Sequence, residues 1–142
     1  MKSITPQQAK ELLDEGYVYL DVRSIEEFEQ GHPQGAFNVP IALAHPMFGM
    51  QPNQDFLKVA EANFPKDTKI ICGCKTGGRS YRAAEVLEQA GYTTVINMDG
   101  GFHGRVDARG AVAQTGWAQE NLPVSSEREG ETSYTSLSAK AT

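Results

Sequence analysis

The sequence predicts an α/β protein in which helices cover both faces of a mostly parallel sheet. Segments rich in β-branched and aromatic residues alternate with segments of helical periodicity, as expected for βαβ units. The apolar segments are short, and none approaches the length of about 20 residues that spans a bilayer. The 142 residues are enough for one domain with a core that needs no disulfide or metal.

The predicted helices have recognisable start and stop signals. Thr5, Pro6 and Gln8 supply an N-cap, a proline at the first helical position and the N3 residue of a capping box, and Gly16 ends this helix. Ser24 caps a short acidic helix that a glycine ends. The helices are predicted over residues 6–15, 25–30, 54–63 (capped by Asn53) and 80–90.

The predicted strands are short segments of apolar, β-branched or aromatic residues. Between them, residues 42–52 are predicted to form a loop, and residues 99–116 are rich in glycine and lack periodicity. A last helical turn is expected to dock Trp117 and Leu122, and the polar residues 125–142 are expected to form a mobile tail. The strands are predicted over residues 17–22, 36–41, 68–73 and 93–98.

Charge and targeting signals narrow the expected partners. The net charge of −5 argues against nucleic acid as a partner, although a local field can still attract a small anion. The N-terminal segment has no apolar signal core, and we expect no membrane contact. The chain has two cysteines, which fits a reducing compartment where free thiols persist, so we expect a cytoplasmic protein.

Cys74 lies where an open α/β sheet places its ligands, beyond the carboxyl end of a strand. The strand ends near Gly73 and the next helix begins near Ser80. Between them, Gly77 and Gly78 allow the backbone to curl, so that several amides and a helix N-terminus converge on one point. These groups, with the neighbouring lysine and arginine, favour the thiolate over the thiol. The loop therefore predicts Cys74 as a nucleophile, against the alternative of a small buried apolar residue.

Cys72 has a different predicted role. It belongs to an apolar segment, two residues before Cys74, and its side chain is expected to fill the core. The alternative is a resolving thiol for a Cys74 that has been oxidised or loaded with sulfur. A metal site is not favoured, because there is no second cysteine pair and the three histidines lack ligand spacing.

Three ordered motifs carry a family resemblance. The loop "CKTGGRS" resembles the active-site loop of single-domain rhodaneses, the thiosulfate sulfurtransferases. The stretch "YLDVRSIEEFEQGHPQGAFNVP" (Tyr19 to Pro40) is similar to a second signature of that family, and "VINMDGGF" is similar to a third. Together the motifs cover most of residues 3–124.

The resemblance implies a rhodanese-like three-layer sandwich and a persulfide mechanism. Cys74 would take a sulfane sulfur from thiosulfate or a persulfide donor. It would pass this sulfur to a thiophilic acceptor, which is cyanide in vitro and a thiol or protein in the cell. The mechanism implies no metal or organic cofactor. Amides from Lys75 to Arg79, through Thr76, Gly77 and Gly78, would form a cradle for the anions.

Further roles follow from the matched positions. Lys75 and Arg79 would either attract the donor's sulfonate or stabilise the loop from behind. Thr76 would contact the ligand or bond its own backbone. Ser80 would cap the helix and reach the sulfur with its hydroxyl, and Phe102 would line the pocket wall.

The second motif is interpreted as supporting scaffold. Arg23 and Glu27 are expected to form an ion pair, with substrate contact as the alternative. Asp21 would either touch the catalytic loop or bond to backbone, and His32 is expected to be a structural histidine rather than a general base.

The chain departs from the family pattern after "GGF". The tryptophan expected three residues later is Trp117, so residues 105–116 are interpreted as an insertion in a domain that spans residues 1–124. The insertion is predicted to be either a neutral surface loop or a lid or docking element, to which Arg105 and Arg109 would add positive charge.

Two other functions stay open. The chain could be a rhodanese-like binding or sulfur-relay module that acts on a protein partner. It could also be a phosphatase or arsenate reductase, but their loops generally place five residues between cysteine and arginine, whereas four separate Cys74 from Arg79.

Overall fold

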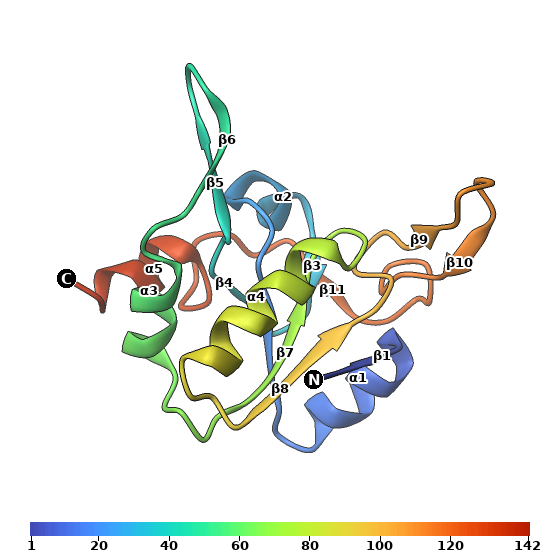
Figure 1. Cartoon of the computed structure of the whole chain (residues 1–142), viewed down its shortest axis with the longest axis horizontal. Helices are drawn as coiled ribbons and strands as arrows, with labels where there is room; N and C mark the ends of the chain where they lie inside the picture. Colours follow the sequence, from blue (N-terminus) through green and yellow to red (C-terminus); the bar gives the residue numbers. More distant parts are fainter.

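A five-stranded parallel sheet forms the centre of the structure, a computed structural model that describes residues 1–142 (Figure 1). Every neighbouring pair in the sheet is parallel, and the spatial order is β1-β8-β7-β2-β4. This confirms the predicted α/β class. The strands are β1 (Lys2–Ile4), β2 (Val18–Asp21), β4 (Phe37–Asn38), β7 (Lys69–Gly73) and β8 (Thr94–Met98).

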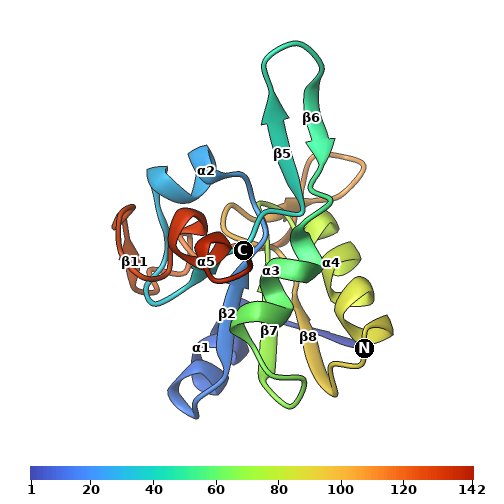
Figure 2. The same ribbon diagram turned by 90° about the vertical axis from the view of Figure 1, so that its left-hand side faces the viewer.

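Helices cover both faces of this sheet and so make three layers (Figures 1 and 2). The core on one face is built from the third, fourth and fifth helices, and the core on the other face from the first and second helices with Trp117. Side chains of a strand alternate between the faces, so Ile70 and Cys72 enter the first core and Ile71 the second. The helices are α1 (Pro6–Asp14), α2 (Ile25–Gln30), α3 (Phe56–Asn63), α4 (Gly78–Gln89) and α5 (Tyr134–Ala139). No helix combines the length and the apolar character needed to cross a membrane.

Local signals place the first two helices correctly. The predicted capping box forms at Thr5, and Ser24, which was predicted as an N-cap, also forms a capping box with Glu27. The prediction for α3 was wrong at its start, because Asp55 is the N-cap residue. Asn53 lies outside that helix, where its Oδ1 accepts from Asp55 N at 3.1 Å and its Nδ2 donates to Pro40 O at 2.9 Å.

Two segments that were predicted as loops form antiparallel hairpins. Residues 42–52 fold into β5 (Ala42–His45) and β6 (Gly49–Pro52), which project from the body of the protein (Figures 1 and 2). Within the glycine-rich segment, β9 (Arg105–Val106) pairs with β10 (Val112–Gln114). The loop prediction missed them because prolines and glycines hide the alternation of short strands.

The C-terminal residues differ from the predicted mobile tail. β11 (Val124–Ser125) pairs with β3 (His32–Pro33), and α5 lies beside α3. The Leu137 side chain is 1% exposed in the first core, and its carbonyl oxygen accepts from Asn63 Nδ2 at 2.9 Å. The C-terminal segment is mostly polar, but a few of its apolar side chains are enough to hold it against the body of the protein, because they pack on the first core.

Leu137→Ala should therefore lower the free energy of unfolding by about 2–4 kcal/mol, through lost burial and a cavity. Urea unfolding measures this loss, and Thr135→Ala on the exposed side of α5 is the matched control. Equal stabilities for the two variants would mean that the tail does not pack on the core.

Candidate active site

Cys74 lies in the loop between the carboxyl end of β7 and the start of α4. Its Sγ accepts a hydrogen bond from Gly77 N at 3.1 Å, and the residue is 1% exposed. Gly77 is the N-cap residue of α4 and has φ of +125°, a conformation that favours glycine. Among the amides from Lys75 to Arg79, that of Gly77 is the one that donates to the sulfur. The curled loop thus holds the cysteine sulfur at the N-terminus of a helix of twelve residues.

The segment after β8 braces this loop through the backbone. Phe102 N donates to Cys74 O at 2.8 Å, and His103 N donates to Lys75 O at 2.9 Å. Gly101 has φ of +56°, and a Cβ atom there would lie 2.5 Å from Cys74 O. Only a glycine therefore allows the third motif to approach the loop so closely.

A second layer supports that brace. Trp117 N donates to Gly101 O at 2.9 Å, and Ala118 N donates to Phe102 O at 3.1 Å. The Trp117 ring is buried, as predicted, and its Nε1 donates to Pro123 O at 2.8 Å. Both ends of the segment 105–116 are thus anchored beside the loop that holds Cys74.

The hairpin within that segment extends away from the body of the protein (Figure 1). At its base, Arg105 Nε donates to Asp99 Oδ1 at 2.9 Å and Nη2 donates to Asp99 Oδ2 at 3.1 Å. The expectation that Arg105 adds positive charge was therefore wrong, because a carboxylate balances it. Arg109 is exposed near the turn of the hairpin.

Arg79 holds the loop from behind. Its Nη1 and Nη2 donate to the two carboxylate oxygens of Glu27, at 2.7 and 3.0 Å. The predicted pairing of Arg23 with Glu27 was wrong, because Glu27 faces α4. A bidentate pair of this kind fixes orientation as well as distance, and here it ties α2 to the first turn of α4.

The titration of Glu27 reports on this pair. Burial raises the pKa of the carboxyl, but hydrogen bonds from Arg79 and Ser24 outweigh burial and lower the pKa to about 2. The unfolded chain has the ordinary glutamate pKa of about 4.3. Because the folded pKa is the lower one, this stabilisation is complete above about pH 4.3 and is lost as the pH falls through about 2.

Glu27→Gln is therefore expected to lower the free energy of unfolding by about 1–2 kcal/mol at pH 6, allowing for partial solvent screening. The deficit should shrink as the pH falls from about 4 towards 2. Urea unfolding across this range measures it, with exposed Glu26→Gln as control. A deficit that is independent of pH would argue against the pair as its source.

Arg23 pairs with Asp21 instead. Arg23 Nη2 lies 2.7 Å from Asp21 Oδ2, both side chains are buried, and Arg23 also donates to Gly31 O at 2.7 Å. The guanidinium carbon lies 4.6 Å from the centre of the Phe102 ring. Asp21 was predicted either to touch the catalytic loop or to bond to backbone. The structure shows the backbone contact, because Asp21 Oδ1 also accepts from Arg23 N. These contacts fit the predicted supporting role.

His32 makes contacts of the kind expected for a structural histidine. Its Nδ1 lies 2.7 Å from Phe28 O, and its ring stacks on the Phe28 ring at 3.6 Å. Burial is the largest effect on its pKa and lowers it, which favours the neutral ring with Nδ1–H as donor.

A small pocket adjoins the loop. It has a volume of about 150 Å³, and Phe102 and His103 line it beside Arg23 and Glu27, whereas Cys74 and the residues of its loop do not. The pKa of His103 is lowered by burial first, and then by the charges of Arg23 and Lys75. Lys75 is exposed and forms no ion pair, so it supplies positive charge next to this pocket. The local field can attract an anion although the whole chain is acidic.

Ser80 and Thr76 differ from the predicted loop roles. Ser80 is buried inside α4, where its Oγ lies 3.1 Å from Gly77 O and 2.6 Å from Asn97 Oδ1. It therefore neither caps the helix nor faces the sulfur. Thr76 is exposed, and its hydroxyl bonds to no backbone group, which removes one of its two predicted roles. In the sequence, the polar Asn97 within an otherwise apolar strand indicates that a buried side chain forms a hydrogen bond with it.

Cys72 fills the core, as predicted. Its side chain is buried, and burial raises the pKa of its thiol well above the ordinary value, with the nearby Cys74 acting in the same direction. A thiol in this environment stays protonated and is a poor nucleophile. Cys72 is therefore not expected to act as the nucleophile, although both cysteine side chains reach the same core.

Known proteins share this fold and sequence pattern. A family model described as a rhodanese-like domain matches residues 5–108. Thiosulfate sulfurtransferase 16 of Arabidopsis thaliana is 40% identical over 121 residues, which are 85% of this chain and 90% of that protein. Thiosulfate sulfurtransferase GlpE of Haemophilus influenzae is 35% identical over 124 residues, which are 87% of this chain and 93% of that protein.

The structural comparison gives the same result. The crystal structure of Rv0390 from M. tuberculosis has a TM-score of 0.72 at 33% identity, and the match covers 89% of this chain and 98% of that one. These likenesses confirm the resemblance carried by the three motifs and the predicted three-layer fold.

Proposed function

The chain belongs to the family of rhodanese-like domains, and on this premise we propose that it transfers sulfane sulfur through a persulfide on Cys74. The observation that carries the proposal is the hydrogen bond from Gly77 N to Cys74 Sγ at 3.1 Å, at the N-terminus of α4. A backbone donor and a helix dipole both favour negative charge on that sulfur. Relatives named thiosulfate sulfurtransferase support the same chemistry.

In the first half-reaction, the Cys74 thiolate attacks the outer sulfur of a donor such as thiosulfate. A bond forms between the two sulfurs, the S–S bond of thiosulfate breaks, and sulfite leaves with the electron pair. The persulfide that remains carries one negative charge, as the thiolate did. Lys75 supplies charge to draw the donor to the loop, and the amide of Gly77 is already oriented towards the anion.

In the second half-reaction, an acceptor removes the outer sulfur and restores the thiolate. The division into two steps through a covalent enzyme is nucleophilic catalysis. Neither step requires a strong base once the thiolate has formed, which agrees with the structural role of His32.

Phosphate-ester or arsenate chemistry is disfavoured by the position of Arg79. An arginine that binds a tetrahedral oxyanion must offer its guanidinium to the ligand. Here both terminal nitrogens of Arg79 donate to Glu27, at 2.7 and 3.0 Å. This contact favours sulfur transfer over a phosphatase reaction at the same loop.

The test supplies the purified protein with thiosulfate and cyanide and measures thiocyanate, in parallel with hydrolysis of p-nitrophenyl phosphate. We expect thiocyanate to form and the phosphate ester to persist. Phosphate release without thiocyanate would favour the phosphatase, and neither product would favour a binding module.

A further inference from the structure

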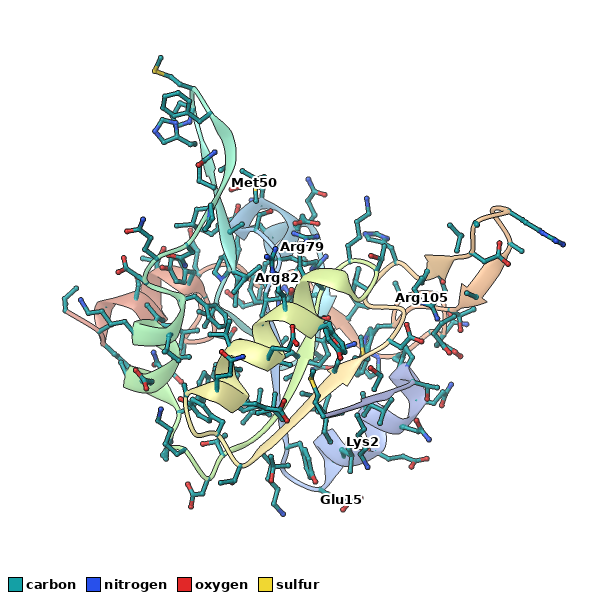
Figure 3. All side chains as sticks on the ribbon, in the orientation of Figure 1. Lys2, Glu15, Met50, Arg79, Arg82 and Arg105 are labelled. Atoms are coloured by element: carbon teal, nitrogen blue, oxygen red, sulfur yellow. The ribbon has the colours of Figure 1, made fainter.

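A groove separate from the small pocket runs between the β5–β6 hairpin and α4. It has a volume of about 560 Å³. Its apolar lining comes from four parts of the chain: Ile41 and Ala42 at the start of β5, Met50 on β6, Phe56 and Leu57 on α3, and Val86 on α4. Figure 3 shows Met50 on the hairpin, with Arg79 and Arg82 below it.

The wall of this groove formed by α4 is positively charged. Arg79 and Arg82 both line it, and no aspartate or glutamate does. Glu27 balances Arg79, whereas Arg82 is exposed and forms no ion pair. An unpaired arginine beside an apolar surface, on a chain with a net charge of −5, favours a ligand with both acidic and apolar groups.

The hairpin extends the apolar surface beyond the groove. Met47, Phe48 and Met50 are 80%, 68% and 49% exposed. The Phe48 ring lies 4.8 Å from the His45 ring, and His45 Nδ1 accepts from Met47 N at 3.1 Å, so the turn is held in shape. A small thiol in the groove would leave the side chains of Met47 and Phe48 in water. A protein-sized partner can cover both surfaces.

The groove is connected to the reactive cysteine through one short helical segment. Arg79 lies two residues after Gly77, which donates to Cys74 Sγ. Among the groups that raise the pKa of Arg79, Glu27 comes first and Cys74 also contributes. Arg79 therefore belongs both to the lining of the groove and to the first turn of the helix that follows the Cys74 loop.

We propose that this groove and the β5–β6 hairpin dock a protein acceptor of the sulfur, through a segment that combines acidic and apolar residues next to a cysteine. This inference rests on the proposed sulfur transfer. The acceptor thiol loses its proton to solvent, and its thiolate attacks the outer sulfur of the Cys74 persulfide. The S–S bond to Cys74 breaks, Cys74 leaves as the thiolate, and the acceptor keeps the sulfur as a persulfide, so no oxidant is consumed.

The test uses two short synthetic peptides in which leucines and a single cysteine are combined with either glutamates or lysines. Each peptide is mixed with protein preloaded from thiosulfate, and the transfer rate is followed by the mass of the peptide. We expect the acidic peptide to react about tenfold faster than the basic one at low salt. Glutathione is the small-thiol comparison.

Three variants locate the docking surface. Arg82→Glu should slow the acidic peptide about tenfold and reverse the preference between the peptides. Met47→Ser with Phe48→Ser should slow the acidic peptide and leave glutathione within about twofold. Arg128→Glu, an exposed arginine of the C-terminal segment, is the charge-matched control and should change neither rate.

Several results would overturn the proposal. Equal transfer rates for the two peptides would show that the groove has no charge preference. If the hairpin variant slowed transfer to glutathione as much as transfer to the acidic peptide, the groove would be a site for small thiols. A dimer in sedimentation that the hairpin variant abolishes would make this surface a contact between copies. Binding of a labelled cysteine-to-serine acidic peptide, measured by fluorescence anisotropy, tests docking even if Cys74 takes no sulfur from thiosulfate.

Discussion

Cys74→Ser is expected to abolish sulfur loading and to reduce thiocyanate formation by a factor on the order of 10³ or more. A serine hydroxyl keeps the shape of the side chain and can still accept from Gly77 N, but it is not ionised near neutral pH and cannot form a persulfide. Steady-state thiocyanate production measures the loss. Circular dichroism of the variant confirms that the fold is retained.

Cys72→Ala is the matched control, because it removes the other sulfur of the chain. Its side chain lies in the core, so the variant should lose about 1 kcal/mol of stability and keep most of its activity. A folded Cys72→Ala protein with a large loss of transfer would instead identify Cys72 as a resolving thiol.

Gly101→Ala is expected to have the largest effect on stability. A Cβ atom at Gly101 would lie 2.5 Å from the carbonyl oxygen of Cys74 and 2.6 Å from that of Lys75, and φ is +56°. Neither backbone group can move without displacing the catalytic loop. We expect a loss of about 3–4 kcal/mol in unfolding free energy. In the protein that still folds, sulfur loading should be slower by about 100-fold, because the sulfur is displaced.

Gly110→Ala separates crowding from backbone strain. Gly110 also has positive φ, +81°, but a Cβ atom there would meet no atom within 4 Å. This variant should lose about 1 kcal/mol from strain alone and keep normal loading. If urea unfolding gives the same loss for both glycines, the close approach of the third motif to the loop is not what holds Cys74.

Local sequence patterns predicted the parts of the fold that depend on local contacts. The capping box at Thr5 and the N-cap at Ser24 involve residues three positions apart, and both form as expected. The burial of Cys72 followed from its place in an apolar strand. The position of Cys74 after that strand followed from the glycines and the helix start.

Contacts between distant residues could not be predicted in the same way. Glu27 is 52 positions from Arg79, and the alternative partner Arg23 is closer in sequence. Arg23 pairs with Asp21, which is nearer to it in sequence than Glu27 is. The sequence places both carboxylates close to Arg23 and does not indicate which of them forms the pair. The docking of Leu137 likewise depends on a face of the core that local periodicity does not reveal.

The groove between the β5–β6 hairpin and α4 shows the same limitation. The sequence predicts a loop over residues 42–52, which gives no position for Met50 relative to Arg82. Only the fold brings the apolar hairpin beside the exposed face of the helix that begins at the catalytic loop. The positive charge of that groove therefore could not be predicted from the sequence.

The most direct test of the central claim is the intact mass of the protein after brief exposure to thiosulfate. We predict a gain of one sulfur atom that maps to the peptide containing Cys74, that cyanide removes, and that Cys74→Ser lacks. An unchanged mass in folded, reduced protein, or a sulfur bound to Cys72 instead, would contradict a persulfide held by this loop.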